Sequence, residues 1–376
     1  MAGIFAGDPT VAAIVFPGVA LGILLGAALF FARHHQRYGP MRGWPGQVTL
    51  ITVLVGVGLA VYAVYPLPRG VDGLCAISGG SAPLFTPLAV VRSAPVSWPA
   101  AAHIALAAGV YVPVGLLARY RYRRGAVVTV AFGLLLALLV EVVQLTGVLG
   151  LYPCAYRVAA VDDVVLGGLG VLVGWLVGIA AVRWLPRPWP GATADMMPPP
   201  ISRRVLGHGL DLGLWWFGAG TLAALAVAVG ALPRHAGAAA TDVALVALAA
   251  LFGLALPLLR RDRCTPGRAS VHLALAGLGR PRPAERWRVL LRSALLYTPV
   301  TVLFVLDLQW WALAVPALHG LPAMTRRDQT GLFDLIAGAR VVTRGAVSGG
   351  LPRKLVRYSA PRAQDGAHTH PPTIPE

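Results

Sequence analysis

The stretch GAVVTVAFGLLLALLVEVVQLTG occupies residues 125–147 and decides the class of the protein. It is 23 residues long, and about 20 apolar residues suffice for an α-helix to cross a bilayer. Glu141 and Gln144 are its strongly polar members, three residues apart and therefore on one helical face. Because a carboxylate at the centre of a membrane helix costs about 2.5–3.5 kcal/mol or more, we expect Glu141 to face the interior of a helical bundle.

The composition indicates that this stretch is one of several membrane spans. Hydrophobic residues make up 57% of the 376 residues and charged residues only 12%, against about 25% in soluble domains. We predict an all-α, polytopic membrane helical bundle of about nine spans, with eight as the alternative. The expected spans lie near 11–32, 47–66, 100–118, 125–147, 161–182, 205–231, 241–259, 289–306 and 308–322.

The number of spans depends on residues 290–324, which could form one long tilted helix or two short ones. A length of 35 residues exceeds a single bilayer crossing, and this favours two helices separated near Asp307. In that case Asp307 is an acid of an outer loop.

Arginine placement predicts the orientation. Basic residues are frequent in every second loop and in the tail, whereas the opposite loops hold only Arg69, Arg92, Arg157 and Arg234. The positive-inside rule then places the N-terminus outside and the C-terminus in the cytoplasm. The formal net charge of +17 belongs to these scattered loops, which indicates contact with anionic membrane lipids and not with nucleic acid. The preference for arginine, alanine and glycine is typical of a GC-rich bacterial genome, so we expect a multi-pass protein of the bacterial plasma membrane.

The chain divides into two membrane halves. Residues 184–200 read WLPRPWPGATADMMPPP, which is too rich in proline for a helix and too polar for a span. We expect a five-span domain at 1–183, a cytoplasmic linker at 184–200, a domain of three or four spans at 201–345, and a disordered basic cytoplasmic tail at 346–376.

A polar cluster is expected where two spans of the first half meet at the outer side. Glu141 lies near the outer end of its span, and Asp162 and Asp163 begin the next span from that same side. Arg157 lies in the loop between them and could neutralise one acid. These residues, with Gln144, either form a ligand-binding pocket at the outer leaflet or clamp two adjacent spans together.

Other chemistry is weakly indicated. Cys75 and Cys154 both fall in outer loops, where they could form a disulfide or remain two thiols. No cysteine and histidine spacing suggests a metal site, and no cofactor is indicated. None of the motifs of soluble enzymes occurs, which favours a non-enzymatic role, although a buried acid could serve an envelope enzyme.

Residues 11–182 resemble the VanZ-like family. Glu141-x-x-Gln144, followed by Arg157 and by Asp163 within VDDVVLGGLG, is similar to that family's order of polar residues, and the segment from Tyr111 to Gly115 is similar to its Phe-x-Pro-x-Gly motif. Three positions depart from the family pattern, because Ala107, Ala160 and Gly167 stand where polar residues are usual. The resemblance implies a role in glycopeptide resistance, with a lipid-linked cell-wall precursor or a lipoglycopeptide as the ligand.

Residues 201–343 resemble the RDD family. Arg204 and Asp211 are similar to its opening Arg and first Asp, Asp334 to its closing Asp, Arg292 to the Arg that begins a later span, and the segment 264–268 to its Thr-Pro-Gly turn. The resemblance implies an ion- or proton-coupled transporter. Asp211 needs a partner, which Arg204, Arg292 or a tail arginine could supply, and the same residues could instead be a structural network in a non-catalytic membrane scaffold. The sequence makes no prediction of the oligomeric state.

Overall fold

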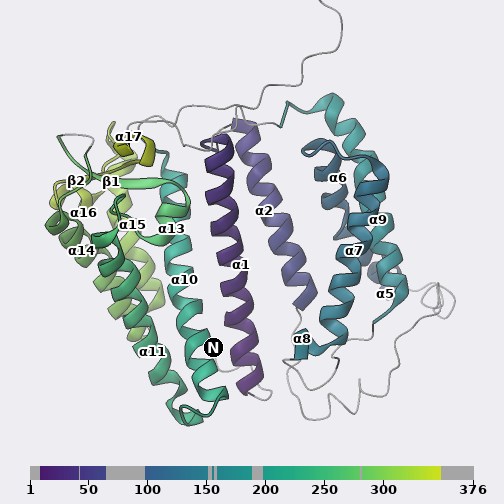
Figure 1. The fold of residues 1–376 in the computed structure, drawn as a ribbon, viewed down its shortest axis with the longest axis horizontal. Coiled ribbons are helices and arrows are strands. Elements are labelled where there is room, and N and C mark those ends of the chain that lie inside the picture. Colours follow the sequence, from purple (N-terminus) through teal and green to yellow (C-terminus); the bar gives the residue numbers. More distant parts are fainter. Residues whose placement is uncertain are drawn as a thin grey trace, which may run out of the picture.

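The structure is a computed structural model, and it describes residues 9–41, 43–64, 98–150, 155, 159–188, 198–279 and 282–348. The described chain is mostly helical, and its long helices run roughly side by side in a bundle (Figure 1). The predicted all-helical membrane bundle is therefore confirmed in class. Arg157, Cys75, Cys154, most of the linker and all of the tail beyond residue 348 lie outside the described residues.

The first half contains one helix for each of the predicted spans, with one of them interrupted. Its helices are α1 (Pro9–Tyr38), α2 (Gly43–Val64), α5 (Trp98–Gly109), α6 (Val112–Tyr120), α7 (Ala126–Leu145), α8 (Gly147–Gly150) and α9 (Val161–Trp184). The third span consists of α5 and α6, which are separated by a turn at 110–111. Pro113 lies in the first turn of α6, where its missing N–H removes no helical hydrogen bond.

The second half contains long helices and a group of short elements at one end. They are α10 (Ile201–Ala228), η2 (Arg234–Ala236), α11 (Gly237–Leu248), η3 (Ala249–Ala255), α12 (Leu256–Leu259), α13 (Pro266–Ser270), β1 (Leu273–Gly277), α14 (Arg286–Val305), α15 (Gln309–Thr325), α16 (Leu332–Ile336), β2 (Ala339–Thr343) and α17 (Arg344–Ser348). The π-helical turn η3 continues α11 into α12, so residues 237–259 form one span.

Eight of the described helical segments are long and apolar enough to cross a membrane. The chain divides near Asp307 as predicted, because α14 ends at Val305 and α15 begins at Gln309. Asp307 occupies this turn with a positive φ of 58°. At 17 residues, α15 would be about 25 Å long, which is shorter than the hydrocarbon core of a typical bilayer.

A two-stranded sheet was not expected from the sequence. β1 and β2 pair antiparallel, with Leu275 opposite Val341. Most of their side chains are buried under the short helices of the second half. The sheet joins residues about 65 positions apart, and it packs the segment after α15 back onto the segment before α14.

Helix α1 packs against the second half of the chain, although in sequence it belongs to the first half. Phe16 lies 5.8 Å from Phe217 between ring centroids, and Leu24 and Phe31 pack against α10 and the loop that follows α13. At its other end the His35 ring stacks on His272 at 4.3 Å. Figure 1 shows α1 between α10 and α2. Helix α1, which belongs to the first five spans in sequence, therefore packs on α10 of the second half.

Helices α6 and α9 approach very closely because glycine lines their contact. A Cβ atom added at Gly115 would overlap the carbonyl oxygen of Val171, and one added at Gly174 would overlap that of Val112. Only a residue without a side chain permits this backbone approach. The contact fixes the start of α9 relative to α5, α6 and α7, where the polar cluster of the first half lies.

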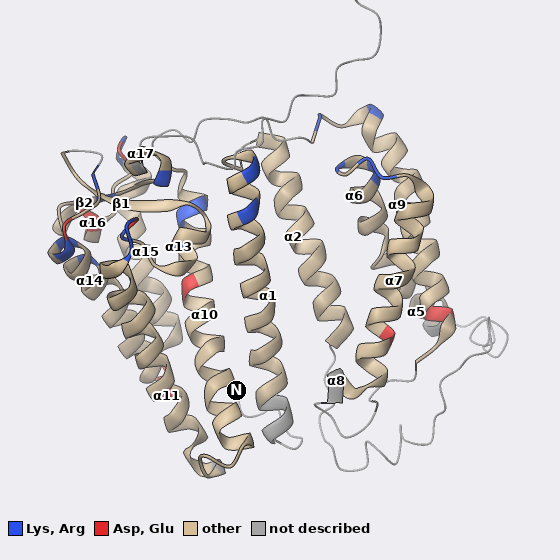
Figure 2. Ribbon diagram, in the orientation of Figure 1, with Lys and Arg blue, Asp and Glu red and all other residues tan. Residues whose placement is uncertain are grey.

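Arginines of the described chain gather at one end of the bundle. Figure 2 shows the arginines at the upper ends of α1 and α10, in the loop between α6 and α7, and around α13 to α17, while the acids of α7 and α9 lie toward the opposite end. This separation agrees with the pattern used to predict the orientation. Which end faces the cytoplasm stays a prediction.

Candidate functional site

Glu141 is held at the interface of α7 and α9. It is 8% exposed, and its Oε2 accepts a hydrogen bond of 3.2 Å from the backbone N–H of Ala160, the N-cap residue of α9. Asp162 and Asp163 occupy the first turn of α9, where the positive end of the helix dipole favours acids. Asp162 is buried as well. The structure thus brings three of the predicted carboxyl groups to one end of two adjacent helices.

Two neighbouring helices complete this polar cluster. Gln144 is 3% exposed, and its Nε2 lies 3.4 Å from the carbonyl oxygen of Ala63 on α2. The Nε2 of His103 on α5 lies 3.2 Å from the Oδ1 of Asp163. Tyr111, in the turn between α5 and α6, is buried, and its ring lies beside Gly167 of α9. Four of the five predicted site residues are therefore placed together, and Arg157 is the one outside the described residues.

His103 and Tyr111 are members of the cluster that sequence reasoning did not include in it. They are eight residues apart, which puts them near one face of the span if it is helical throughout. Ala107 lies halfway between them and is also buried. This spacing was the available signal, because a histidine inside an apolar span is unusual and faces the bundle interior in most cases.

The departures from the family pattern have a structural consequence. At Ala160 the backbone N–H, which any residue but proline would offer, is what contacts Glu141. At Gly167 an added Cβ would lie 2.7 Å from the Cβ of Ala137 and 3.2 Å from the ring of Tyr111. An asparagine would need these helices to separate, because the close packing of α7 on α9 leaves no space for a side chain at this position.

An apolar groove begins beside the cluster. It has a volume of about 760 Å³ and is lined by α2, α6 and α7. Ala63, Val140 and Val143 line it near Glu141 and Gln144, and Arg124 lines it at the other end of α7. Its walls between these points are apolar and include Gly56, Leu59, Ala60, Phe132 and Leu136. The groove thus connects a polar end with a basic end along the length of a membrane helix.

Asp211 in the second half is fully buried, with none of its surface exposed. Its Oδ1 accepts a 2.6 Å hydrogen bond from the backbone N–H of Gly267, and its Oδ2 accepts one from the hydroxyl of Thr265. Asp211 therefore binds the turn that begins α13. Among the described residues, Thr265 and Gly267 donate hydrogen bonds to this carboxylate, for which the sequence had offered Arg204, Arg292 or a tail arginine as a possible partner.

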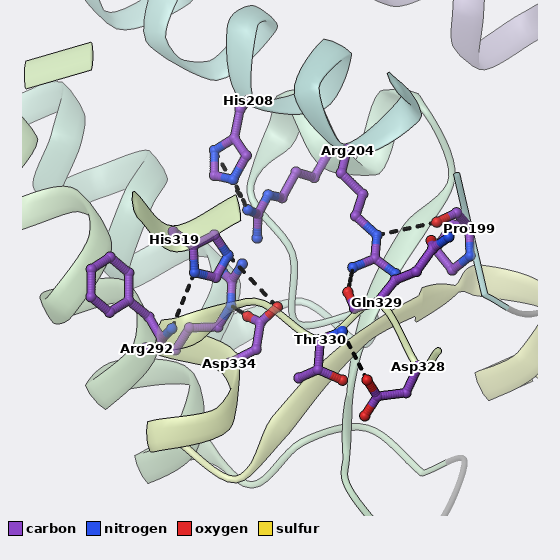
Figure 3. A network of polar contacts seen from close by, with 11 residues as sticks. Pro199, Arg204, His208, Arg292, His319, Asp328, Gln329, Thr330 and Asp334 are labelled. Atoms are coloured by element: carbon purple, nitrogen blue, oxygen red, sulfur yellow. Dashed lines mark hydrogen bonds and ion pairs between the residues drawn. The ribbon is translucent and has the colours of Figure 1, made fainter. Parts of the chain in front are cut away.

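Asp334 forms a buried ion pair with Arg292. It is 1% exposed. The Nε of Arg292 donates to its Oδ1, and the Nε2 of His319 lies 3.7 Å from its Oδ2 (Figure 3). Burial alone would raise the pKa of Asp334, but the positive charge of Arg292 outweighs it and holds the pKa below its usual value.

Arg204 ties α10 to two loops. Its Nε donates to the carbonyl oxygen of Pro199 at 3.2 Å, and its Nη1 donates to that of Gln329 (Figure 3). His208, one turn further along α10, contacts the guanidinium of Arg268. The contacts of Arg204, Asp211 and Asp334 are thus made within the protein, as expected of a structural network.

The described residues contain no group of three or more histidine, cysteine, aspartate or glutamate side chains placed to hold a metal ion. Cys264, the cysteine in the described part of the chain, is a buried free thiol. Burial raises its pKa to about 12, so it is protonated and unreactive at neutral pH.

Comparison with known proteins gave one family match. No RDD domain was found, so the resemblance of residues 201–343 to that family is not confirmed. No curated protein and no solved structure matches the chain. Residues 50–182 match the family model described as VanZ/LLP1, which excludes α1 and spans the whole polar cluster and its groove. The protein is therefore a multi-pass membrane protein whose residues 50–182 form a VanZ/LLP1 family domain.

Proposed function

We propose that the VanZ-like domain binds an amphipathic molecule from the outer leaflet of the bacterial plasma membrane. The observation that carries this proposal is the apolar groove of about 760 Å³, whose lining residues Val140 and Val143 are the chain neighbours of Glu141 and Gln144. An acyl chain or similar tail would lie between α2 and α7, and a polar head would meet the acidic cluster. The position of the cluster at the end of α7 opposite the basic loops supports an outer-leaflet site.

The charge of the cluster favours one kind of head group. Glu141, Asp162 and Asp163 contribute three carboxyl groups, and His103 is partly exposed beside them. Acids attract amines and hydrogen-bond donors and repel phosphates. Of the two ligand classes that the family resemblance implies, a lipoglycopeptide that carries an amine fits this cluster better than an anionic lipid-linked cell-wall precursor. Resistance by sequestration of such a molecule is the function we propose.

The substitution Glu141→Gln tests the proposal, because glutamine has the same shape and can still accept the hydrogen bond from Ala160. We expect the folded protein to remain and its affinity for an amine-bearing lipoglycopeptide to fall about tenfold, as for the loss of one charge-assisted hydrogen bond. Glu285→Gln, at an exposed acid of the second half, is the matched control. Binding to purified protein and resistance of a strain that depends on it would both be measured.

The groove can be tested separately from the charge. Ala60→Phe on α2 would fill the groove without touching the acids. We expect it to reduce binding of the lipid-tailed compound and to spare binding of the same compound without its tail. Resistance that is equal in the wild type, Glu141→Gln and Ala60→Phe, at equal protein levels, would refute the proposed function.

An ion- or proton-coupled transporter in the second half is the alternative, and a non-catalytic scaffold is the third possibility. The contacts of Asp211 with Thr265 and Gly267, and of Asp334 with Arg292, favour the scaffold for this half. Ion flux in proteoliposomes distinguishes the two. A flux that Asp211→Asn abolishes in stably folded protein would support transport.

A further inference from the structure

A second pocket of about 640 Å³ lies at the basic end of the bundle. It is formed by the last turns of α1 and by the loop between α6 and α7. The guanidinium of Arg121 in that loop lies 6.0 Å from the ring centroid of Tyr38 on α1, so the two walls are in close proximity. Its volume falls within the range of about 300–1,000 Å³ that is common for small-molecule sites.

The polar part of this pocket is strongly basic. Its lining includes Arg33 and Arg37 from α1 and Arg121 and Arg123 from the loop, and none of its lining residues is acidic. Arg33 and Arg37 are four residues apart, so they lie one above the other on the same face of α1. Four guanidinium groups around one pocket attract a group with more than a single hydrogen-bond acceptor, and phosphate meets this requirement.

The other part of the pocket is apolar and lies deeper along α1. Gly26, Leu29 and Phe30 line it, and Leu29 is exposed. Helix α1 has 30 residues and is about 45 Å long, against about 30 Å for the hydrocarbon core. Its end with Arg33 and Arg37 therefore fits the head-group region when Leu29 and Phe30 lie among acyl chains. The pocket has the polarity of a phospholipid, from phosphate to chain.

We propose that this pocket binds an anionic phospholipid of the cytoplasmic leaflet, with its phosphate at the four arginines and an acyl chain along Leu29 and Phe30. The site lies between α1, which packs on the second half, and the α6–α7 loop of the VanZ-like domain. The bound lipid therefore bridges the two halves of the protein and stabilises their association. This role is independent of the proposed site at Glu141.

The experiment uses the full-length protein in detergent. Phosphatidylglycerol, phosphatidylcholine or inorganic phosphate is added in separate samples. Thermal unfolding measures the stabilisation by each addition, and native mass spectrometry measures its binding. The test variant is the double substitution Arg33→Gln and Arg37→Gln, at two exposed residues. The matched control is Arg183→Gln with Arg261→Gln, which removes the same charge from exposed arginines that lie outside the pocket. We expect phosphatidylglycerol to stabilise the wild type and the control saturably, and to bind the test variant roughly thirtyfold more weakly.

Three outcomes would overturn the inference. Equal stabilisation of the test variant and the control by phosphatidylglycerol would show diffuse attraction to the basic surface and no defined site. A full effect of inorganic phosphate alone would show an anion site without a role for the acyl chain. If phosphatidylcholine stabilised the wild type as much as phosphatidylglycerol does, the arginines would not be selecting an anionic lipid.

Discussion

The ion pair between Arg292 and Asp334 shows how far the partner of a buried charge can be predicted from the sequence. The sequence indicated both residues through their resemblance to a family motif, and it indicated that a buried acid needs a basic partner. It could not say which arginine pairs with which acid, because several lie within reach of each other once α10, α14 and α16 meet. The choice follows from the Thr265–Gly267 turn, whose donors satisfy Asp211 and leave Arg292 to Asp334.

Asp334→Asn should destabilise the protein by about 3 kcal/mol, because it leaves the Arg292 guanidinium buried without a countercharge. The unfolding free energy in detergent micelles measures this. Since the pKa of Asp334 is lowered in the folded state, the carboxylate stabilises the fold above its unfolded pKa of about 3.9 and loses that contribution as pH falls through the lower folded value. The loss of unfolding free energy in Asp334→Asn, relative to the wild type, should be complete at pH 7 and should shrink only below about pH 4.

Asp328→Asn is the internal control for this prediction. Asp328 pairs with Arg326 on the surface, where water and salt screen the charges. We expect its unfolding free energy to be indistinguishable from that of the wild type. An Asp334→Asn protein as stable as the Asp328→Asn protein would mean that the buried pair does not hold α16 to the bundle.

At the scale of elements, the sequence predicted the long helices well and the short elements poorly. Apolar length alone indicated the spans, and Asp307 marked the break between α14 and α15. The strands escaped prediction because LALAG and ARVVT are too short to show a period of two and are far apart in the chain. Glycine within apolar runs indicated close packing, but only the structure shows that α6 and α9 are the helices that use it.

Gly174→Leu should separate α6 from α9, because a side chain at this position has no space beside the carbonyl oxygen of Val112. We expect destabilisation of about 2 kcal/mol or more, or loss of folded protein from the membrane. Gly58→Leu on α2 is the control, since an added Cβ there meets no atom within 4 Å. Folded yield and thermal unfolding of the two variants would be compared, and equal behaviour would contradict the close contact.

At the scale of the whole molecule, the order of the spans does not give their arrangement. The proline-rich segment 184–200 divides the sequence into two halves. Helix α1 belongs to the first half in sequence, yet it packs on α10 of the second half. No local pattern encodes this, because an apolar helix can pack against any of its neighbours in a membrane. The histidines that fix its end, His35 and His272, are separated by most of the chain. The family match begins at residue 50 and so does not include α1.

This arrangement predicts how the protein would reassemble from two pieces. Residues 1–190 and 191–376, expressed together as separate chains, should purify as a complex, because α1 carries its contacts with α10 and His272 into the first piece. A piece comprising residues 43–190 lacks α1. At equal expression, we expect several times less of the 191–376 piece to purify with it than with residues 1–190. The reciprocal pair tests the assignment further, since a peptide of residues 9–41 alone should associate with 191–376 in detergent and not with 43–190. Equal recovery of 191–376 with and without α1 would show that other helices join the halves and that the packing of α1 on α10 contributes little to their association.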